Sequence, residues 1–196
     1  KEKIAHKFRK PTYHIMSEIQ PELNSTLEEL SNHIKNASEN LRLAADALSR
    51  ASDVNRYLFK VVAFESCDNR GYYIAHRNSL GYTLKLDDSP LVADFIFKLI
   101  AGLDGRGVSF ESVNYPGHFL RHQFYQIKLH KYDNTPLFQK DASYIINKQG
   151  AFFTFESVNM PGHFIRHRSN NELWADRKED SDVYIKSSLF RQSQLF

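Results

Sequence analysis

The residues best suited to chemistry lie in a phrase that the chain spells three times. Residues 110–122 read FESVNYPGHFLRH, residues 155–167 read FESVNMPGHFIRH, and a weaker copy, FESCDNRGYYIAH, occupies residues 64–76. The last histidines of the copies are His76, His122 and His167. Downstream of each, an acid precedes an aromatic or aliphatic segment, and these acids are Asp94, Asp141 and Asp182. Imidazole and carboxylate groups exchange hydrogen bonds with polar ligands. One plausible acid per copy does not supply the two carboxylates that glycoside hydrolysis needs, so we expect no catalytic residues.

The spacing of the copies predicts the fold that must position these residues. The leading phenylalanines are Phe64, Phe110 and Phe155, which gives periods of 46 and 45 residues. Between them lie short segments rich in Phe, Tyr, Ile and Val, separated by turn signals such as Asn159–Gly162. Three such repeats are too few for the usual propeller of about four or more blades. We therefore expect an all-β domain, a β-trefoil of three repeats of about 45 residues, with a six-stranded barrel capped by three hairpins.

The N-terminal region follows a different period. From Leu27 to Ala51, apolar residues recur at alternating steps of three and four, which is heptad spacing. Ser25 and Glu28 form a capping-box pattern at the start of this stripe. We expect a long helix from about Ser25 to about Arg50, preceded by a short helix that ends at Pro21. The domains are therefore placed at residues 1–57, a helical segment, and residues 58–196, the β-trefoil.

The repeated phrase also carries a family resemblance. The pattern S-x-N-x-P-G-x-F-[LI]-R-H, followed by an aspartate about twenty residues later, resembles the arabinofuranosidase-B domain, the family-42 carbohydrate-binding module. The resemblance covers residues 58–196 and implies a β-trefoil that binds arabinofuranose side chains of plant arabinoxylan, without catalysing a reaction. It implies sugar contacts from a histidine and an aspartate in each repeat: His122 with Asp141, His167 with Asp182, and His76 with Asp94. The last pair lies in the repeat that departs most, because Ala75 replaces the arginine and Asn69–Arg70 replaces the residue and proline of the turn.

Sugar recognition needs hydroxyl partners and an apolar surface for the ring. Tyr125 in the second repeat and Trp174 in the third supply aromatic rings beside the histidine–aspartate pairs. The alternative is that each pair is a structural hydrogen bond that ties a hairpin to its neighbour. A structural role is also expected for the acid that all three copies share, which is Glu65, Glu111 or Glu156.

Composition excludes several other classes. The net charge is only +3, with acids and bases interspersed, so nucleic acid is not an expected partner. No apolar run approaches the roughly 20 residues of a membrane span. Cys67 is the sole cysteine, which rules out an internal disulfide and a cysteine-based zinc site. The histidine pairs of the phrase fall on expected strands, so no metal is predicted, and no cofactor is expected.

The helix suggests assembly. We expect its stripe to meet another helix, in the same chain or another one, through Leu27, Leu30, Ile34, Leu41 and Leu48. Asn24 and Asn36 begin possible N-glycosylation sequons, which favours an extracellular or cell-surface protein. The sequence thus predicts a non-catalytic carbohydrate-binding module. The alternative is a protein-interaction scaffold, in which the β domain has lost sugar binding and the helix, as a coiled coil, mediates assembly.

Overall fold

The computed structural model describes residues 13–55 and 57–195. The chain divides into two compact units, Lys1–Arg50 and Ala51–Phe196, and each is described by itself. The sequence placed the boundary between residues 57 and 58. The strands begin shortly after that point, with β1 at Val61–Ser66.

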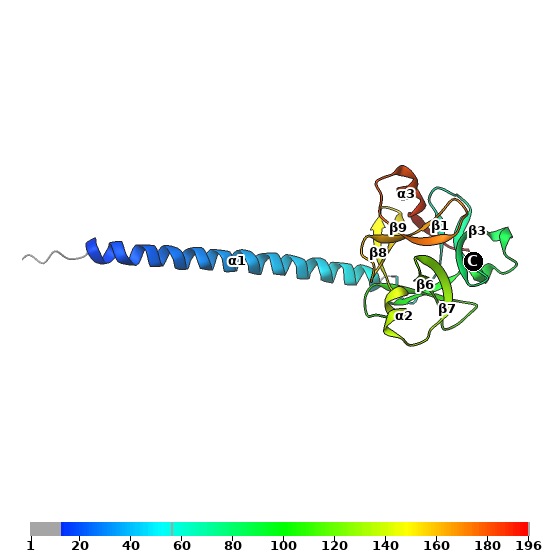
Figure 1. Cartoon of the computed structure of the whole chain (residues 1–196), viewed down its shortest axis with the longest axis horizontal. Helices are drawn as coiled ribbons and strands as arrows, with labels where there is room; N and C mark the ends of the chain where they lie inside the picture. Colours follow the sequence, from blue (N-terminus) through cyan, green and yellow to red (C-terminus); the bar gives the residue numbers. More distant parts are fainter. Residues whose placement is uncertain (1–12, 56, 196) are drawn as a thin grey trace, which may run out of the picture. The chain divides into compact units, whose positions relative to one another are not determined.

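One long helix, α1, runs from Tyr13 to Asn55, and its residues from Ala51 onward are assigned to the second unit (Figure 1). The predicted break at Pro21 is wrong, because Pro21 lies inside the helix. A proline removes one backbone hydrogen bond, but no other proline and no glycine follows it within α1, so helical propensity carries the chain through. Ser25 is consequently an internal residue and does not cap a helix start. The large apolar side chains of the stripe, from Leu27 to Leu48, are exposed.

The second unit is built from twelve short strands. Their bounds are β1 Val61–Ser66, β2 Tyr72–Arg77, β3 Leu80–Lys85, β4 Phe97–Ala101, β5 Val108–Ser112, β6 His118–Gln123, β7 Gln126–Lys131, β8 Tyr144–Gln149, β9 Phe152–Ser157, β10 His163–His167, β11 Leu173–Arg177 and β12 Phe190–Ser193. All of them pair antiparallel in the order β10-β11-β7-β3-β2-β1-β12-β9-β8-β5-β4, with β6 between β5 and β7. Additional pairings of β1 with β4 and of β9 with β10 close the sheet.

The predicted β-trefoil is corrected by this topology. The predicted fold had a six-stranded barrel and three hairpins that capped it without being part of its sheet. In the structure the hairpin strands are hydrogen-bonded into the same sheet as the other strands, through pairs such as Glu65 with Tyr73 and Glu111 with Phe119. The fold is therefore a closed antiparallel β-barrel, and the helix that precedes it is present as expected.

The repeated phenylalanines meet in the core of the barrel. Phe64, Phe110 and Phe155 are almost completely buried, and the ring centroids of Phe110 and Phe155 lie 4.9 Å apart in an edge-to-face arrangement. Phe64 contacts both of the other rings in the same way. Edge-to-face packing aligns the positive edge of one ring with the negative face of another. The repeat therefore brings one aromatic residue from each third of the domain to a common centre.

Short helical turns precede the last strand of each repeat. They are η1 (Leu86–Asp88) and η2 (Val92–Phe95) in the first repeat, α2 (Pro136–Asp141) in the second and α3 (Asp182–Ser187) in the third. Thr135 and Ser181 cap α2 and α3 by accepting a hydrogen bond from a backbone N–H of the first turn. In Figure 1, α2 lies beside β6 and α3 lies at the side of the barrel that carries β8 and β9. Among the described helices, none is long and apolar enough to cross a membrane.

Candidate functional site

The tips of the three hairpins are joined by a ring of backbone hydrogen bonds. The carbonyl of Ser79 accepts from the N–H of Leu129, that of Tyr125 from Ala175, and that of Asn171 from Thr83. Ser79, Tyr125 and Asn171 all adopt positive φ angles, of 63°, 67° and 63°. Each hairpin tip is therefore fixed to the second strand of the next hairpin, and the third tip returns to the first.

The repeated glutamates hold the turns that follow them. One carboxylate oxygen of Glu65, Glu111 and Glu156 accepts from the N–H of Gly71, Gly117 and Gly162, at 2.8, 2.9 and 2.7 Å. These glycines adopt positive φ angles of 75–83°, a conformation that glycine adopts at little cost. The structural role expected for the glutamates is confirmed.

At the junction of the second and third repeats, His122 and Asp141 are joined through a third residue. Nε2 of His122 lies 2.8 Å from Oδ1 of Asn159 and 3.5 Å from Oδ1 of Asp141. Nδ2 of Asn159 donates to Asp141 at 2.7 Å, so the oxygen of the amide must face the histidine. Nε2 of His122 therefore carries the proton. The hydroxyl of Ser157 also contacts this oxygen, at 2.9 Å.

The junction of the first and second repeats has the same arrangement. Nε2 of His76 lies 3.0 Å from Oδ1 of Asn114, whose Nδ2 donates to Asp94 at 2.7 Å. The direct distance from His76 to Asp94 is 3.8 Å. The structure thus brings both predicted pairs together, and in each an asparagine from the next repeat lies between the histidine and the acid.

The junction of the third and first repeats is different. Nε2 of His167 lies 2.8 Å from Oδ1 of Asp68, which occupies the position of Asn114 and Asn159 in the phrase. Asp182 does not join His167. It starts α3, its side chain is exposed, and its charged neighbour is Lys186 at 4.0 Å. The position that Asp141 holds at the end of α2 is held at the end of α3 by Ser187.

This difference amounts to an exchange of residues across the junction. The second site combines an amide, Asn159, with an acid, Asp141. The third site has the acid in the phrase, Asp68, and a small hydroxyl residue, Ser187, at the end of the helix. Each junction therefore retains one carboxylate close to its histidine. In the third junction this carboxylate comes from the repeated phrase and not from the segment before the last strand of the repeat.

The ion pair made by the arginine of the phrase depends on whether an acid ends the nearby short helix. Arg121 is buried, donates to Asp141 at 2.6 Å, and lies over the ring of Phe138 at 4.9 Å. Arg166 lies in the same way over Tyr184, at 5.1 Å, but without an acid at position 187 its nearest carboxylate is Asp176, at 3.9 Å. The cation–π interaction thus recurs in both repeats, whereas the strong ion pair exists only in the second.

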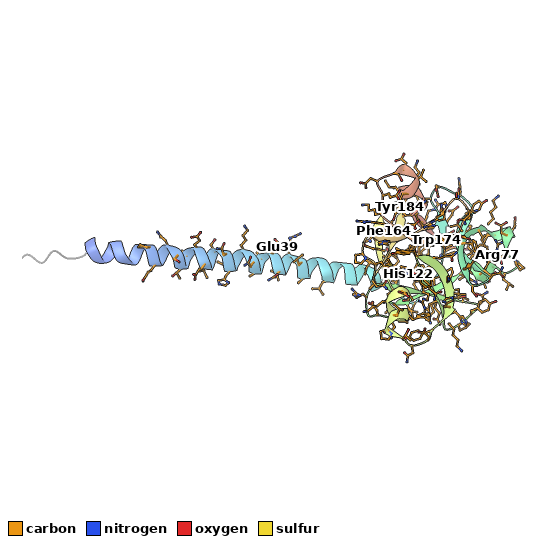
Figure 2. The ribbon with its side chains drawn as sticks, viewed as in Figure 1. Glu39, Arg77, His122, Phe164, Trp174 and Tyr184 are labelled. Atoms are coloured by element: carbon orange, nitrogen blue, oxygen red, sulfur yellow. The ribbon has the colours of Figure 1, made fainter. Side chains whose placement is uncertain are left out.

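The two predicted aromatic residues lie beside each other on adjoining hairpins. The carbonyl of Tyr125 accepts from the residue after Trp174, and Trp174 lies opposite Gln126 across β11 and β7. The ring of Tyr125 lies 5.7 Å from that of His163, and Arg168 lies 3.9 Å above the ring of Trp174 (labelled in Figure 2). Both rings are thus near the hairpin tips, and Trp174 is already covered on one face by a guanidinium.

A cavity of about 240 Å³ opens beside the first junction. It is lined by His76, Asn78, Ser79, Tyr115, His118 and Leu129. The ring of Tyr115 is about half exposed and lies 5.4 Å from that of His76 and 5.8 Å from that of His118. Nδ1 of His118 lies 3.3 Å from the carbonyl of Pro116, so this nitrogen donates and Nε2 of the neutral ring can accept. The cavity therefore combines an aromatic ring with polar groups of both kinds.

Burial sets the charge state of the histidine in this cavity. It lowers the pKa of His76, and the neighbouring His118 acts in the same direction, whereas the hydrogen bond to Asn114 and the charge of Asp94 oppose the shift. His76 is consequently neutral near pH 7, with its proton on the nitrogen that faces Asn114. Its other nitrogen then acts as an acceptor.

The residues that connect these sites were not predicted from the sequence. The linking residues are Ser112, Asn114, Ser157, Asn159 and Asp68, and the exposed ring at the first cavity is Tyr115. The signal was available, because serine and asparagine recur two positions apart in the phrase. What the phrase does not reveal is that each histidine reaches the residue two places after the serine in the next copy, which is Asn114 for His76, Asn159 for His122 and Asp68 for His167.

In the part of the chain that the structure describes, no group of three or more His, Cys, Asp and Glu side chains could hold a metal ion. Cys67 is partly buried and unpaired, beside a cavity of about 220 Å³ that also includes Arg70 and Arg191. The site is thus a set of hydrogen-bonding and aromatic side chains.

Curated proteins similar to this chain are fungal enzymes. An arabinofuranosidase/β-xylosidase from Trichoderma koningii and an alpha-L-arabinofuranosidase from Hypocrea jecorina are each 34% identical to it over 115 residues. These matches cover 55% of this chain but only 22% of each relative. The chain therefore corresponds to less than a quarter of the length of these enzymes.

Solved structures give the same relationship. An arabinofuranosidase complexed with arabinofuranosyl-alpha-1,2-xylobiose is 26% identical, with a TM-score of 0.64 over 69% of this chain and 31% of that chain. An alpha-L-arabinofuranosidase soaked with a cyclic sulfate inhibitor is also 26% identical, with a TM-score of 0.61 over 68% of this chain and 31% of that chain. The family model of the alpha-L-arabinofuranosidase B (ABFB) domain matches residues 62–196, which include all of β2 to β12. The chain therefore belongs to the alpha-L-arabinofuranosidase B domain family.

Proposed function

We propose that the β domain is a non-catalytic carbohydrate-binding module for sugars that carry arabinofuranose. The observation that supports this most is the cavity between His76, Tyr115 and His118, where an exposed aromatic ring meets hydrogen-bonding groups. A sugar ring packs its apolar face on an aromatic ring, while its hydroxyls bond to the polar groups around it. The arabinofuranose class is suggested by the family and by the arabinofuranosyl ligand of the similar crystal structure.

We propose that the other two junctions also contact sugar, through aromatic rings near the hairpin tips and not through their buried polar pairs. Tyr125 with His163, and Trp174 with Arg168, offer rings near the hairpin tips. His122 and Asp141 are buried, and their polar atoms are engaged with Asn159, Ser157 and Arg121. We therefore propose that this pair positions the second junction and that the half-exposed ring of Tyr125 and the partly buried ring of Trp174 make the contact with a sugar. Asp182 would contribute only from the surface of α3.

Absence of catalysis is part of the proposal. Hydrolysis of a glycoside uses two carboxylates on either side of one bond. At each junction one carboxylate approaches the histidine, and in the second it is paired with Arg121. The chain also matches less than a third of the length of the similar arabinofuranosidase structures.

A scaffold role is the second candidate, and the buried network supports it. His122, Asn159 and Asp141 bond to one another across a repeat boundary, as a structural tie would. The exposed stripe of α1 adds a surface for another helix, in the same chain or another one. An extracellular location is proposed as well, because Asn24 and Asn36 lie on exposed positions of α1 where N-glycans would be tolerated.

Calorimetry with the whole chain tests the proposal. The ligands are arabinose, an arabinofuranosyl xylobiose and unbranched xylobiose as the control. Tyr115→Ala should weaken binding about tenfold or more, since aromatic stacking contributes strongly to sugar affinity. Phe124→Asn, at an exposed ring outside the cavity, should leave it unchanged. If the wild-type protein binds none of the three sugars, the scaffold role is the better account.

A further inference from the structure

The stripe of α1 is a surface without a cover in the described structure. In heptad terms, Leu27, Ile34, Leu41 and Leu48 share position a, and Leu30, Ala37 and Ala44 share position d. All of them are exposed, and Leu41 and Leu48 have more than 70% of their surface open, at 73% and 72%. Burying exposed apolar area on this scale against a partner is favourable, because it removes the area from water.

The charges of the helix leave this surface free. Position by position, every charged residue from Glu22 to Arg50 falls at b, c or f. These residues are Glu22, Glu28, Glu29, Lys35, Glu39, Arg42, Asp46 and Arg50. The flanking e and g positions hold Ser31, Ser38, Ala45, Thr26, His33 and Asn40, which are small or polar. Charges at e and g normally select one partner and reject another. Here two identical helices meet without like-charge repulsion, which favours a second copy as the partner.

The sizes of the side chains select an orientation. From Ile34 onward, position a is always large and position d is alanine. In a parallel pair, a faces a and d faces d, so large layers would alternate with layers of alanine that leave voids. In an antiparallel pair, a faces d, so a large side chain at a can fill the space left by an alanine at d. The small residues at e also permit the two backbones to approach closely.

We propose that α1 pairs with α1 of a second copy of the chain in antiparallel orientation. The register that best matches large with small places Ile34 opposite Ala44 of the second copy and Leu41 opposite Ala37 of the second copy. It also places Leu48 opposite Leu30 of the second copy. The pair is then symmetric about Glu39, which is labelled near the middle of α1 in Figure 2. This inference rests on the proposed use of the stripe as a helix-binding surface and is independent of sugar binding.

A size exchange tests both partner and orientation. Ala37→Leu and Leu41→Ala should each weaken association of the whole chain about tenfold or more, because one overfills a layer and the other empties it. The double variant Ala37→Leu/Leu41→Ala should restore association, since the two changes face each other across the pair. In a parallel pair, Ala37→Leu alone would strengthen association. Sedimentation equilibrium measures all four proteins, and Asn32→Asp, at position f, is the control for an unrelated change on the outer face.

A distance measurement gives the register directly. In the proposed register, position 28 lies level with position 50 of the second copy, about 22 residues from that copy's own position 28. In a Cys67→Ser background, spin labels at Glu28→Cys should therefore lie about 33 Å apart along the pair. Labels at Glu39→Cys should lie at the same level of the pair, on its two outer faces, and therefore give a much shorter distance than labels at position 28. Similar distances at the two positions would show a parallel pair and overturn the antiparallel inference while keeping the stripe as an interface. A wild-type monomer, with no dipolar signal at either position, would overturn pairing with a second copy, and sugar binding would remain to be judged separately.

Discussion

The imidazole of His167 lies 2.8 Å from the carboxylate of Asp68, although 99 residues separate them in the chain. This contact joins the last repeat to the first. At the other two junctions the histidine meets an asparagine whose amide is held by an acid, whereas here it meets the acid directly. The repeats are therefore equivalent in shape but not in charge, and substitutions can test that difference.

The first prediction exchanges the two arrangements. Asp68→Asn should destabilise the domain, because His167 then has no charged partner. Ser187→Asp should also destabilise it, by placing a second acid near Asp68. The double variant Asp68→Asn/Ser187→Asp reproduces the second junction and should be more stable than the sum of the single effects implies. Urea denaturation of the four proteins measures this coupling, and strictly additive effects would show that position 187 does not face the junction.

Acid should weaken the same junction. Burial disfavours the charge on Asp68, but hydrogen bonds from His167 and Ser66 outweigh it and hold the pKa of Asp68 below its usual value. The stability that this carboxylate adds is complete above the unfolded pKa of about 3.9 and is lost as the pH falls through the lower, folded pKa. We compare the free energies of unfolding of the wild type and Asp68→Asn by urea denaturation from pH 7 to pH 2. The difference between them should therefore shrink below about pH 4. A difference that stays constant over this range would contradict the ion pair.

Because the pKa of His76 is lowered, we expect a second pH dependence of the stability of the domain, at milder pH. Because burial lowers its pKa, the unfolded chain takes up a proton at about pH 6.5 while the folded domain does not. Stability should therefore decline as the pH falls from 7 through 6.5, until the folded histidine also becomes protonated. The polar and titratable groups that face His76 are Ser112, Asn114, Asp94, Tyr115 and His118. His76→Gln should remove this part of the decline in thermal melts, and an unchanged slope would place it on another group.

A substitution in the core should change the free energy of unfolding by a larger amount. Phe110→Ala should lower the free energy of unfolding by about 3–5 kcal/mol, because it removes a fully buried ring that packs against both Phe64 and Phe155. Leu137→Ala, at an exposed position of α2, is the control and should change it little. Near-identical unfolding curves for Phe110→Ala and wild type would mean that the repeats are not centred on these rings.

A hairpin tip offers a stabilising change. Phe124 and Tyr125 form a two-residue turn with φ angles of 52° and 67°, a conformation that bulky residues adopt at a cost. The first hairpin has Asn78 at the corresponding position, with a φ of 53°. Phe124 is 85% exposed, so its ring adds little packing, and Phe124→Asn should stabilise the domain by about 1 kcal/mol. The reverse change, Asn78→Phe, should destabilise it, and thermal melting compares the two.

The repeat allowed much of the domain to be predicted from the sequence. The buried phenylalanines, the structural glutamates and two of the three histidine–acid pairs all follow from one phrase, because identical residues in repeated positions occupy identical surroundings. The third pair was misassigned, since Asp182 was matched to His167 as a downstream acid of the same repeat, while the actual partner, Asp68, lies in the first repeat. Bonds that run from one repeat to the next have no signature in the spacing within a repeat.

Two further errors have local causes. The β-trefoil was inferred from repeat number and length, which do not specify that the hairpins join the sheet through pairs such as Phe164 with Glu156. The helix was ended at Pro21 because proline usually breaks one, but a single missing hydrogen bond did not interrupt α1. Pairing across the sheet and cooperative extension of a helix both depend on neighbours that local patterns do not include.

The ring of hydrogen bonds at the hairpin tips has a consequence for chain connectivity. Since Asn171 bonds to Thr83 as Ser79 bonds to Leu129, no repeat is structurally first. β1 and β12 are also direct neighbours, with Ala63 opposite Ser193, so the two ends of the barrel sequence can be joined by a short linker. A circular permutant opened in the exposed turn at Gly105, which lies between β4 and β5, would then keep every strand pairing. The order in which the repeats are encoded is therefore separable from the barrel that they form.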